Sequence, residues 1–181
     1  VDGNPAAPGS VLADLFFPVD TYDAAGVADL VPTMQEQYVL HGVLTGGADV
    51  APTVALAAEA AELPGIPHSI AALTHDKGKV REVLTKAKLD RFQPAYTIMG
   101  RDLVLDQYAL AIESVLGYPA VFKPMSQRAS RGVSLVRTPE QLVPALDRVI
   151  EHGETFLIEE CLVGTEHSAE MILDAPGSCC W

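Results

Sequence analysis

The chain has 181 residues and 49% of them are apolar, which is enough to build a packed core in one domain or two small ones. Its 24 acidic and 12 basic residues give a formal net charge of -12, so its field repels nucleic-acid phosphates and anionic membranes. No apolar run is long enough to cross a bilayer and no signal-peptide pattern is present, so we expect a soluble cytoplasmic protein that binds neither nucleic acid nor membranes.

The first part of the chain predicts alternating strands and helices. Residues 1–10 have the composition of a strand end followed by a turn-rich loop, and residues 16–19 form a short β-like run. Helical spacing follows and is interrupted by Pro32. A short apolar strand after Gly42 then leads into an alanine-rich helix, which Asp49 is placed to cap. These βα units predict one module that ends near residues 70–76.

The remainder of the chain predicts a second module of α+β type. A helix beginning at Thr74 carries Lys77 in its first turn. After a strand at residues 95–99, a further helix is predicted between Asp102, its expected cap, and Gly117, its expected end. Lys77 therefore lies close to the start of this second module.

A hairpin and another helix follow. Strands are predicted at residues 119–123, 133–136, 156–158 and 167–173. The loop 124–132 joins the first two of these strands as a hairpin with a long connection. In the next helix, Thr138 is the expected cap, Pro139 takes the first position and Gln141 completes a capping box. Pro144 is expected to bend this helix because it removes a backbone donor.

Two clusters carry side chains suited to binding a nucleotide. Lys123 ends an apolar strand, and the loop after it contains hydroxyls, two arginines and a glycine, which suit an anion. Glu159 and Glu160 end a second apolar strand, where carboxylates can accept hydrogen bonds from an amino group or from sugar hydroxyls. Taken alone, the first cluster is explained equally well by a strand-end lysine that reaches solvent, and the second is better explained by a solvated strand end. No spacing of histidine and cysteine residues indicates a metal site.

The order of these parts resembles the ATP-grasp superfamily. The similarity lies in three stretches, HDKGKVREVLTKAKL, GYPAVFKPMSQRASRGVSLVRTPEQL and FLIEECLVGTEHSAEMI. It implies an α/β fold with a partial Rossmann-like preATP-grasp domain over residues 1–73. Residues 74–181 would then be the α+β N-terminal half of an ATP-grasp domain.

The resemblance also implies a role for each matching residue. Lys77 and Lys123 would contact the ATP phosphates, and the loop that covers the phosphates would include Ser126, Ser130, Arg131 and Gly132. Glu159, Glu160 and Leu162 would read the adenine edge, and Glu166 would hold the ribose hydroxyls. Ala129 departs from the pattern, because such loops often carry glycine at that place.

The family implies an ATP-dependent ligase that activates a carboxylate as an acyl phosphate, using ATP and Mg²⁺. The expected partners are ATP and a small carboxylate, and a homodimer is a possible assembly. Both ends of the chain have the character of cut ends, so we expect the first strand, the magnesium ligands and the substrate-binding core to lie outside it. We therefore expect the chain alone to be inactive as a ligase, and the sequence assigns no catalytic residue.

Two other interpretations remain open at this point. A non-catalytic nucleotide-binding module would use the same two lysines. A nicotinamide-dependent oxidoreductase is suggested by Asp2 at a strand end, but no G-x-G-x-x-G precedes a helix, and that interpretation leaves Lys123 to Glu166 unexplained. The identity of the carboxylate stays open, because amino-acid, purine-pathway, peptide and carbamoyl-phosphate enzymes share this nucleotide half.

Overall fold

The computed structural model describes residues 1–127, 130–169, 172–174 and 178–180. The chain divides into two compact units, one made of Val1–Gln93 with Pro124–Arg131 and one made of Pro94–Lys123 with Gly132–Trp181. The boundary expected between residues 73 and 74 stays a prediction. Within the described ranges, no helix has the length and apolar character needed to span a membrane.

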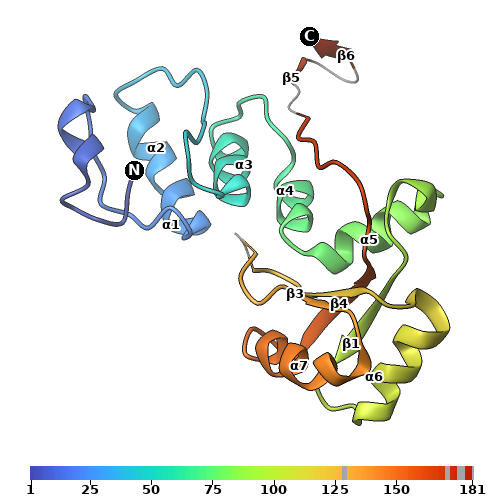
Figure 1. Cartoon of the computed structure of the whole chain (residues 1–181). Coiled ribbons are helices and arrows are strands. Elements are labelled where there is room, and N and C mark those ends of the chain that lie inside the picture. Colours follow the sequence, from blue (N-terminus) through green and yellow to red (C-terminus); the bar gives the residue numbers. More distant parts are fainter. Residues whose placement is uncertain (128–129, 170–171, 175–177, 181) are drawn as a thin grey trace. The chain divides into compact units, whose positions relative to one another are not determined.

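The first unit is built from short helices joined by extended segments (Figure 1). Its helices are η1 (Pro8–Leu12), α1 (Ala24–Ala28), α2 (Leu30–Gln35), α3 (Ala51–Ala60), α4 (His68–Thr74), α5 (Lys77–Lys86) and η2 (Asp90–Phe92). A small core forms where Val31 of α2 packs with Ala57 and Ala61 at the end of α3. Alanine predominates on the buried side of α3, and small side chains allow neighbouring helices to approach closely.

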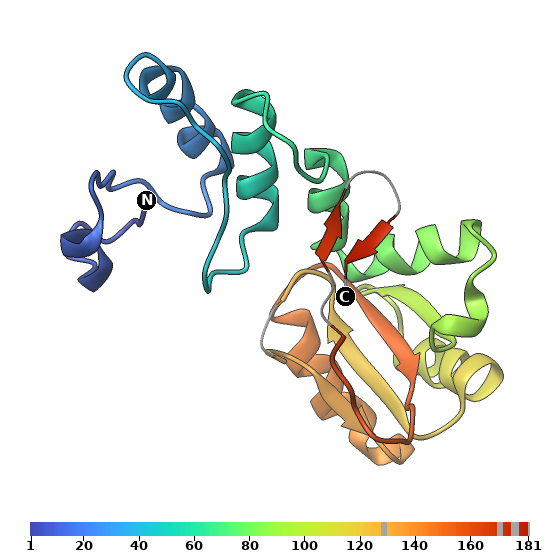
Figure 2. The same ribbon diagram turned by 90° about the horizontal axis from the view of Figure 1, so that it is seen from above.

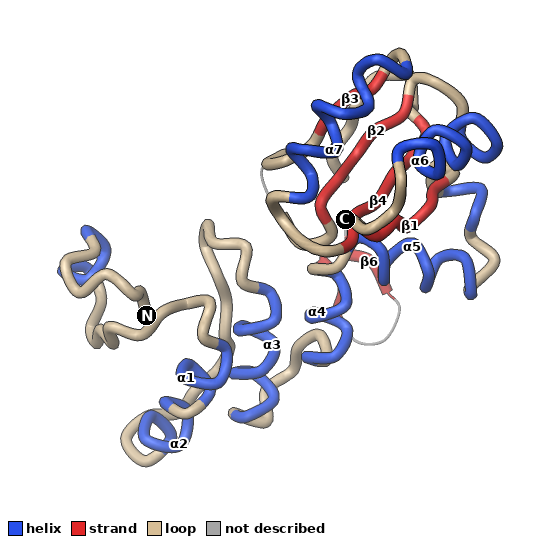
Figure 3. The backbone as a smooth tube through the Cα atoms, turned by 90° about the horizontal axis from the view of Figure 1, so that it is seen from below, coloured by secondary structure: helices blue, strands red, loops and turns tan. Residues whose placement is uncertain are grey.

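The strands expected in this unit do not form. Within residues 1–93, all of which the structure describes, the chain is either helical or irregular, as the tan segments of Figure 3 show. Residues 16–19 and 42–45 are irregular. One backbone hydrogen bond, from Asp2 N to Phe17 O at 3.3 Å, joins the first residues of the chain to the segment 16–19. A strand exists only when neighbouring strands take up its backbone groups, and no such ladder is present here.

Two helix starts in this unit also differ from expectation. Val50, not Asp49, is the residue before α3, and Asp49 instead lies 3.2 Å from Nε2 of His75. The helix predicted from Thr74 is α5, which begins at Lys77, and Thr74 is instead the last residue of α4. Asp76 caps α5, because its carboxylate accepts a hydrogen bond from Lys79 N at 3.0 Å.

The second unit contains a four-stranded sheet in the order β1-β4-β2-β3. Its strands are β1 (Tyr96–Gly100), β2 (Ala120–Pro124), β3 (Ser134–Val136) and β4 (Thr155–Glu160). β2 and β3 form the predicted antiparallel hairpin, with Ala120 opposite Val136. β4 lies between β1 and β2, so the strand that ends in the two glutamates neighbours the strand that ends at Lys123.

Two helical segments cover one face of this sheet (Figure 2). α6 (Leu105–Ala111) continues into the π-helical turn Ile112–Leu116, and α7 (Leu142–Ile150) follows the 3-10 turn η4 (Pro139–Gln141). Alternate residues of the strands point toward the helices, so Phe122 and Phe156 stack with ring centroids 5.9 Å apart beside Tyr108 and Ile112. This packing makes the sheet a rigid platform for the side chains on its other face.

The helix boundaries of the second unit follow the sequence in part. Gly117 ends the α6 segment as expected, with a φ of 74°. The residue before α6 is Val104 rather than Asp102, and the Gln107 side chain accepts from Val104 N at 3.0 Å. Pro144 causes no break, because α7 begins only at Leu142 and its first turn requires no backbone donor from position 144.

The last described strands, β5 (Ile172–Asp174) and β6 (Ser178–Cys180), pair antiparallel. The strand predicted at residues 167–173 is therefore present in part. Residues 167–169 are not in a strand, and residues 170–171 lie outside the described part of the chain.

Candidate nucleotide-binding site

The ends of two neighbouring strands bring a lysine and a carboxylate together. Lys123 extends from β2 and its Nζ donates a hydrogen bond to Oε2 of Glu159 on β4. The Glu159 side chain is 1% exposed, whereas that of Lys123 is 29% exposed. A carboxylate so deeply buried requires a cation or donors beside it. The Lys123 ammonium is therefore partly accessible to solvent, and the buried Glu159 carboxylate holds it in place.

The segment after β4 continues from this pair into solvent. Glu160 N donates to Ala95 O at 3.0 Å and Cys161 N donates to Pro119 O at 3.2 Å, which fixes the backbone at the strand end. Beyond that point the chain is exposed, with Leu162 at 69% exposure and Glu166 also at the surface. The second unit thus gathers Lys123, Glu159 and Glu160 at one end of its sheet, and places Leu162 and Glu166 on the segment that follows.

Lys77 lies in the first unit and contacts the loop that connects β2 to β3. Its backbone N donates to Met125 O at 3.1 Å, and its Nζ donates to Gln127 O at 2.5 Å. Ser126 lies between these two acceptors. Residues Ser130 and Gly132 have left-handed backbones, with φ of 59° and 71°. Ala129 lies outside the described residues.

A pocket of about 460 Å³ borders this loop in the first unit. It is lined by Tyr22, Gly47, Ala48, Asp49, Ser126, Gln127 and Arg131. Arg131 offers a guanidinium and Asp49 a carboxylate, so the pocket has polar groups of both signs around a space large enough for a small molecule. The sequence did not indicate Tyr22 or Asp49 as pocket residues, because they come from loops far from the phosphate-loop motif.

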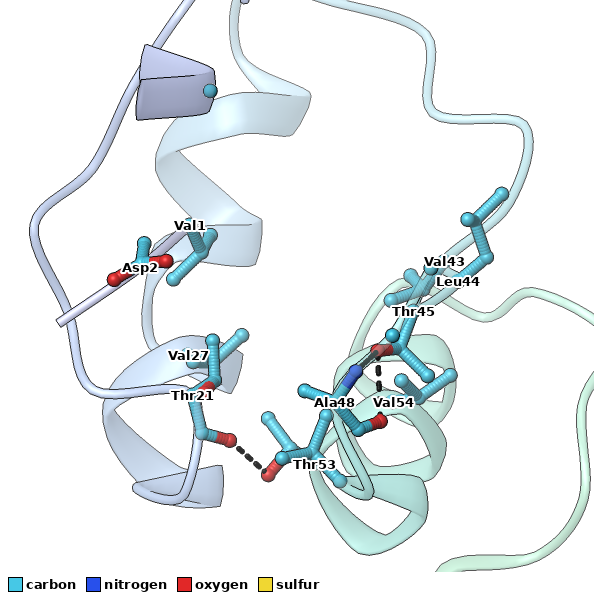
Figure 4. Close-up of a pocket in the computed structure, with 14 residues that line it drawn as sticks. Val1, Asp2, Thr21, Val27, Val43, Leu44, Thr45, Ala48, Thr53 and Val54 are labelled. Atoms are coloured by element: carbon cyan, nitrogen blue, oxygen red, sulfur yellow. Dashed lines mark hydrogen bonds between the residues drawn. The ribbon is translucent and has the colours of Figure 1, made fainter. Parts of the chain in front are cut away.

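A second pocket, of about 620 Å³, lies nearer the start of the chain (Figure 4). Val1 and Asp2 border one side, residues 43–48 border the other, and Thr53 of α3 lies at its base. Thr53 Oγ1 donates to Thr21 O at 2.7 Å, so the hydroxyl at the base is already engaged. The rest of the lining is predominantly apolar, and its residues carry no motif for nucleotide binding.

Tyr118 precedes β2, the strand that carries Lys123, and its ionisation is perturbed. Burial raises the pKa of Tyr118 above its ordinary value of 10.0, and the nearby carboxylates of Glu113 and Glu140 raise it further. The Tyr118 hydroxyl has no hydrogen-bond partner among the described residues. Tyr118 therefore stays neutral beside the strand that holds the candidate phosphate ligand.

No group of three histidine, cysteine, aspartate or glutamate side chains gathers within the part of the chain that the structure describes. A Mg²⁺ ion in proteins is usually held by one or two carboxylates together with phosphate oxygens and water.

Comparison with known proteins finds one ligase family that this geometry resembles. The family model described as D-ala D-ala ligase C-terminus matches residues 91–176, which include the sheet and both strand ends. The D-alanine–D-alanine ligase from Bacillus anthracis superimposes with a TM-score of 0.58 at 21% identity, covering 76% of this chain and 44% of that one. The matched family model and the structural neighbours are those of ATP-grasp ligases, the superfamily that the sequence resembles. Its α/β fold with an antiparallel sheet agrees with the expectation from sequence.

Two further proteins are similar to this chain. The L-amino acid ligase from Bacillus licheniformis gives a TM-score of 0.56 at 26% identity and covers 77% of this chain and 31% of that one. A D-alanine–D-alanine ligase from Glaesserella parasuis is 27% identical over 161 residues, which are 86% of this chain and 48% of that protein. This chain thus spans about half the length of the curated relatives it matches.

Proposed function

We propose that this chain is the ATP-binding portion of a ligase that activates a carboxylate as an acyl phosphate for attack by an amine or another nucleophile. The observation that carries the proposal is the pair formed by Lys123 and the buried Glu159 at adjacent strand ends. The pair offers a partly exposed cation for phosphate oxygens, and the buried carboxylate holds that cation in place. The matched relatives, which are D-alanine–D-alanine ligases, support this choice of function.

The proposed reaction has two steps. A carboxylate oxygen of the substrate bonds to the γ-phosphorus of ATP while the bond from that phosphorus to the ADP oxygen breaks. An amine then bonds to the acyl carbon, inorganic phosphate leaves, and the amine loses a proton. The role of the protein residues is electrostatic, because Lys77 and Lys123 would neutralise phosphate charge and the loop of Ser126, Ser130, Arg131 and Gly132 would exclude water.

We further propose that the activated carboxylate belongs to an amino acid. The relatives named as D-alanine–D-alanine and L-amino acid ligases support this class of substrate. The pocket beside the loop supports it as well, since Arg131 and Asp49 offer one group for a carboxylate and one for an amino group. Glu160, Leu162 and Glu166 would complete the contacts to adenine and ribose.

The affinity for ATP, measured by isothermal titration calorimetry in magnesium buffer, tests the proposal. We expect Lys123→Met and Glu166→Ala each to weaken ATP binding at least about tenfold, which corresponds to about 1.4 kcal/mol. Lys86→Met on exposed α5 is the matched control and should bind as the wild type does. Glu166 lies on an exposed segment, so its variant keeps the test valid if Lys123→Met is too unstable. Unchanged affinity in both site variants would refute the assigned site.

A further inference from the structure

Lys77 is bound to the β2–β3 loop through two different atoms. Its backbone N–H donates to Met125 O at 3.1 Å, and its side-chain ammonium donates to Gln127 O at 2.5 Å. The two acceptors are alternate residues of one loop, separated only by Ser126. All of these residues lie in the first compact unit, so the contact is internal to it.

The position of Lys77 at the start of α5 explains the first of these bonds. The first backbone N–H groups of a helix have no partner within the helix. The Asp76 carboxylate accepts from Lys79 N at 3.0 Å, and the Met125 carbonyl accepts from Lys77 N. A side chain and the loop therefore cap this helix together, and the helix start fixes the place of Met125.

The second bond fixes the direction in which the loop leaves that place. A hydrogen bond from an ammonium to a carbonyl is charge-assisted and stronger than a bond between neutral groups. Pro124, the residue before Met125, is itself fully buried at the end of β2. Burial fixes Pro124, and hydrogen bonds from Lys77 fix Met125 and Gln127, so the first half of the loop is held at three positions.

From this geometry we infer that Lys77 is a positioning residue for the loop, and that its ammonium tethers the loop to α5 before any nucleotide binds. The inference goes beyond the proposed contact between Lys77 and phosphate and does not depend on it. The acceptor is the main-chain carbonyl of Gln127, so the identity of the side chain at position 127 should be unimportant. Ser126, which lies between the two acceptors, lines the adjacent pocket, as does Arg131.

The rate of trypsin cleavage after Arg131, followed by mass spectrometry without nucleotide, tests the tether. Cleavage of a transiently opened loop tracks the population of its open form when closing is fast. Lys77→Met removes the ammonium and keeps the backbone N–H, so we expect cleavage to become about tenfold faster, which corresponds to about 1.4 kcal/mol. Lys77→Arg keeps a cationic donor and should restore most of the protection.

Two control variants separate the tether from other effects. Lys79→Met removes an exposed lysine of the same helix turn, 3.7 Å from Asp76, and should cleave at the wild-type rate. Gln127→Ala keeps the acceptor carbonyl and should also cleave at the wild-type rate. The inference is overturned if Lys77→Met cleaves within about twofold of the wild type, or if either control is accelerated as much as Lys77→Met. Because no nucleotide is present, this outcome is independent of whether the chain binds ATP.

Discussion

Removing the ammonium of Lys123 should destabilise the second unit strongly, because it leaves the buried carboxylate of Glu159 without its cation. The perturbation is Lys123→Met, which keeps the length and apolar stem of the side chain. The Glu159 side chain is 1% exposed and cannot move into water without disrupting β4. The loss of one partner from a buried ion pair costs about 3–5 kcal/mol. Lys123 itself is 29% exposed, so we expect a value near the lower limit, about 3 kcal/mol.

Urea denaturation followed by far-ultraviolet circular dichroism measures this cost as a change in the unfolding midpoint. Lys86→Met makes the same change at an exposed position of α5 and should alter stability by less than about 0.5 kcal/mol. The double variant Lys123→Met/Glu159→Leu removes both charges and should be more stable than the sum of its single variants by at least about 1 kcal/mol. If Lys123→Met lowers the free energy of unfolding by less than about 1 kcal/mol, the ion pair does not stabilise the unit as its burial implies. The same conclusion follows if the effects of the two single variants add up to that of the double variant.

Three further variants test other parts of the fold. Tyr118→Phe should equal or exceed the wild type in stability at neutral pH, because it removes a buried hydroxyl that has no partner among the described residues. Because the pKa of Tyr118 is raised, the unfolded chain ionises first, so the stability of the wild type should fall relative to Tyr118→Phe as pH rises above 10.0 in a denaturation series. Gly117→Ala should cost about 1–3 kcal/mol through backbone strain alone, since φ is 74° and an added Cβ meets nothing within 4 Å; a calorimetric melting temperature equal to that of the wild type would contradict this. Asp76→Ala should cost about 1 kcal/mol by removing the cap of α5, and faster amide exchange confined to that helix is the expected signature.

The second unit was predictable from sequence because its signals are local. The strand before Lys123, its hairpin partner and the strand ending in Glu159 each carry an apolar run bounded by turn formers. Gly117 marked the end of its helix for the reason the structure confirms, a left-handed backbone. The helix after Pro139 was expected to bend at Pro144. A 3-10 turn occupies residues 139–141 instead, so α7 begins at Leu142 and Pro144 falls in its first turn, where no backbone donor is needed.

The first unit was harder to predict because its strands depend on partners that sequence does not reveal. Apolar runs such as residues 16–19 have the composition of strands, but pairing decides whether a strand forms. The contact of Lys77 with the loop was also hidden, because its acceptors are main-chain carbonyls about fifty residues away in the chain. Side-chain patterns indicate which residue types can bind phosphate, but they carry no information on such backbone contacts. The assignment of the site residues to adenine, ribose and phosphate stays a prediction.

The affinities of the unmodified chain for ATP and for NADH, compared by calorimetry in the same magnesium buffer, test the central claim most directly. An ATP-grasp site with cations for the phosphates and carboxylates for adenine and ribose should bind ATP at least about tenfold more tightly than NADH, a difference of about 1.4 kcal/mol. Binding of NADH as tight as that of ATP, or no binding of ATP at all, would contradict the account.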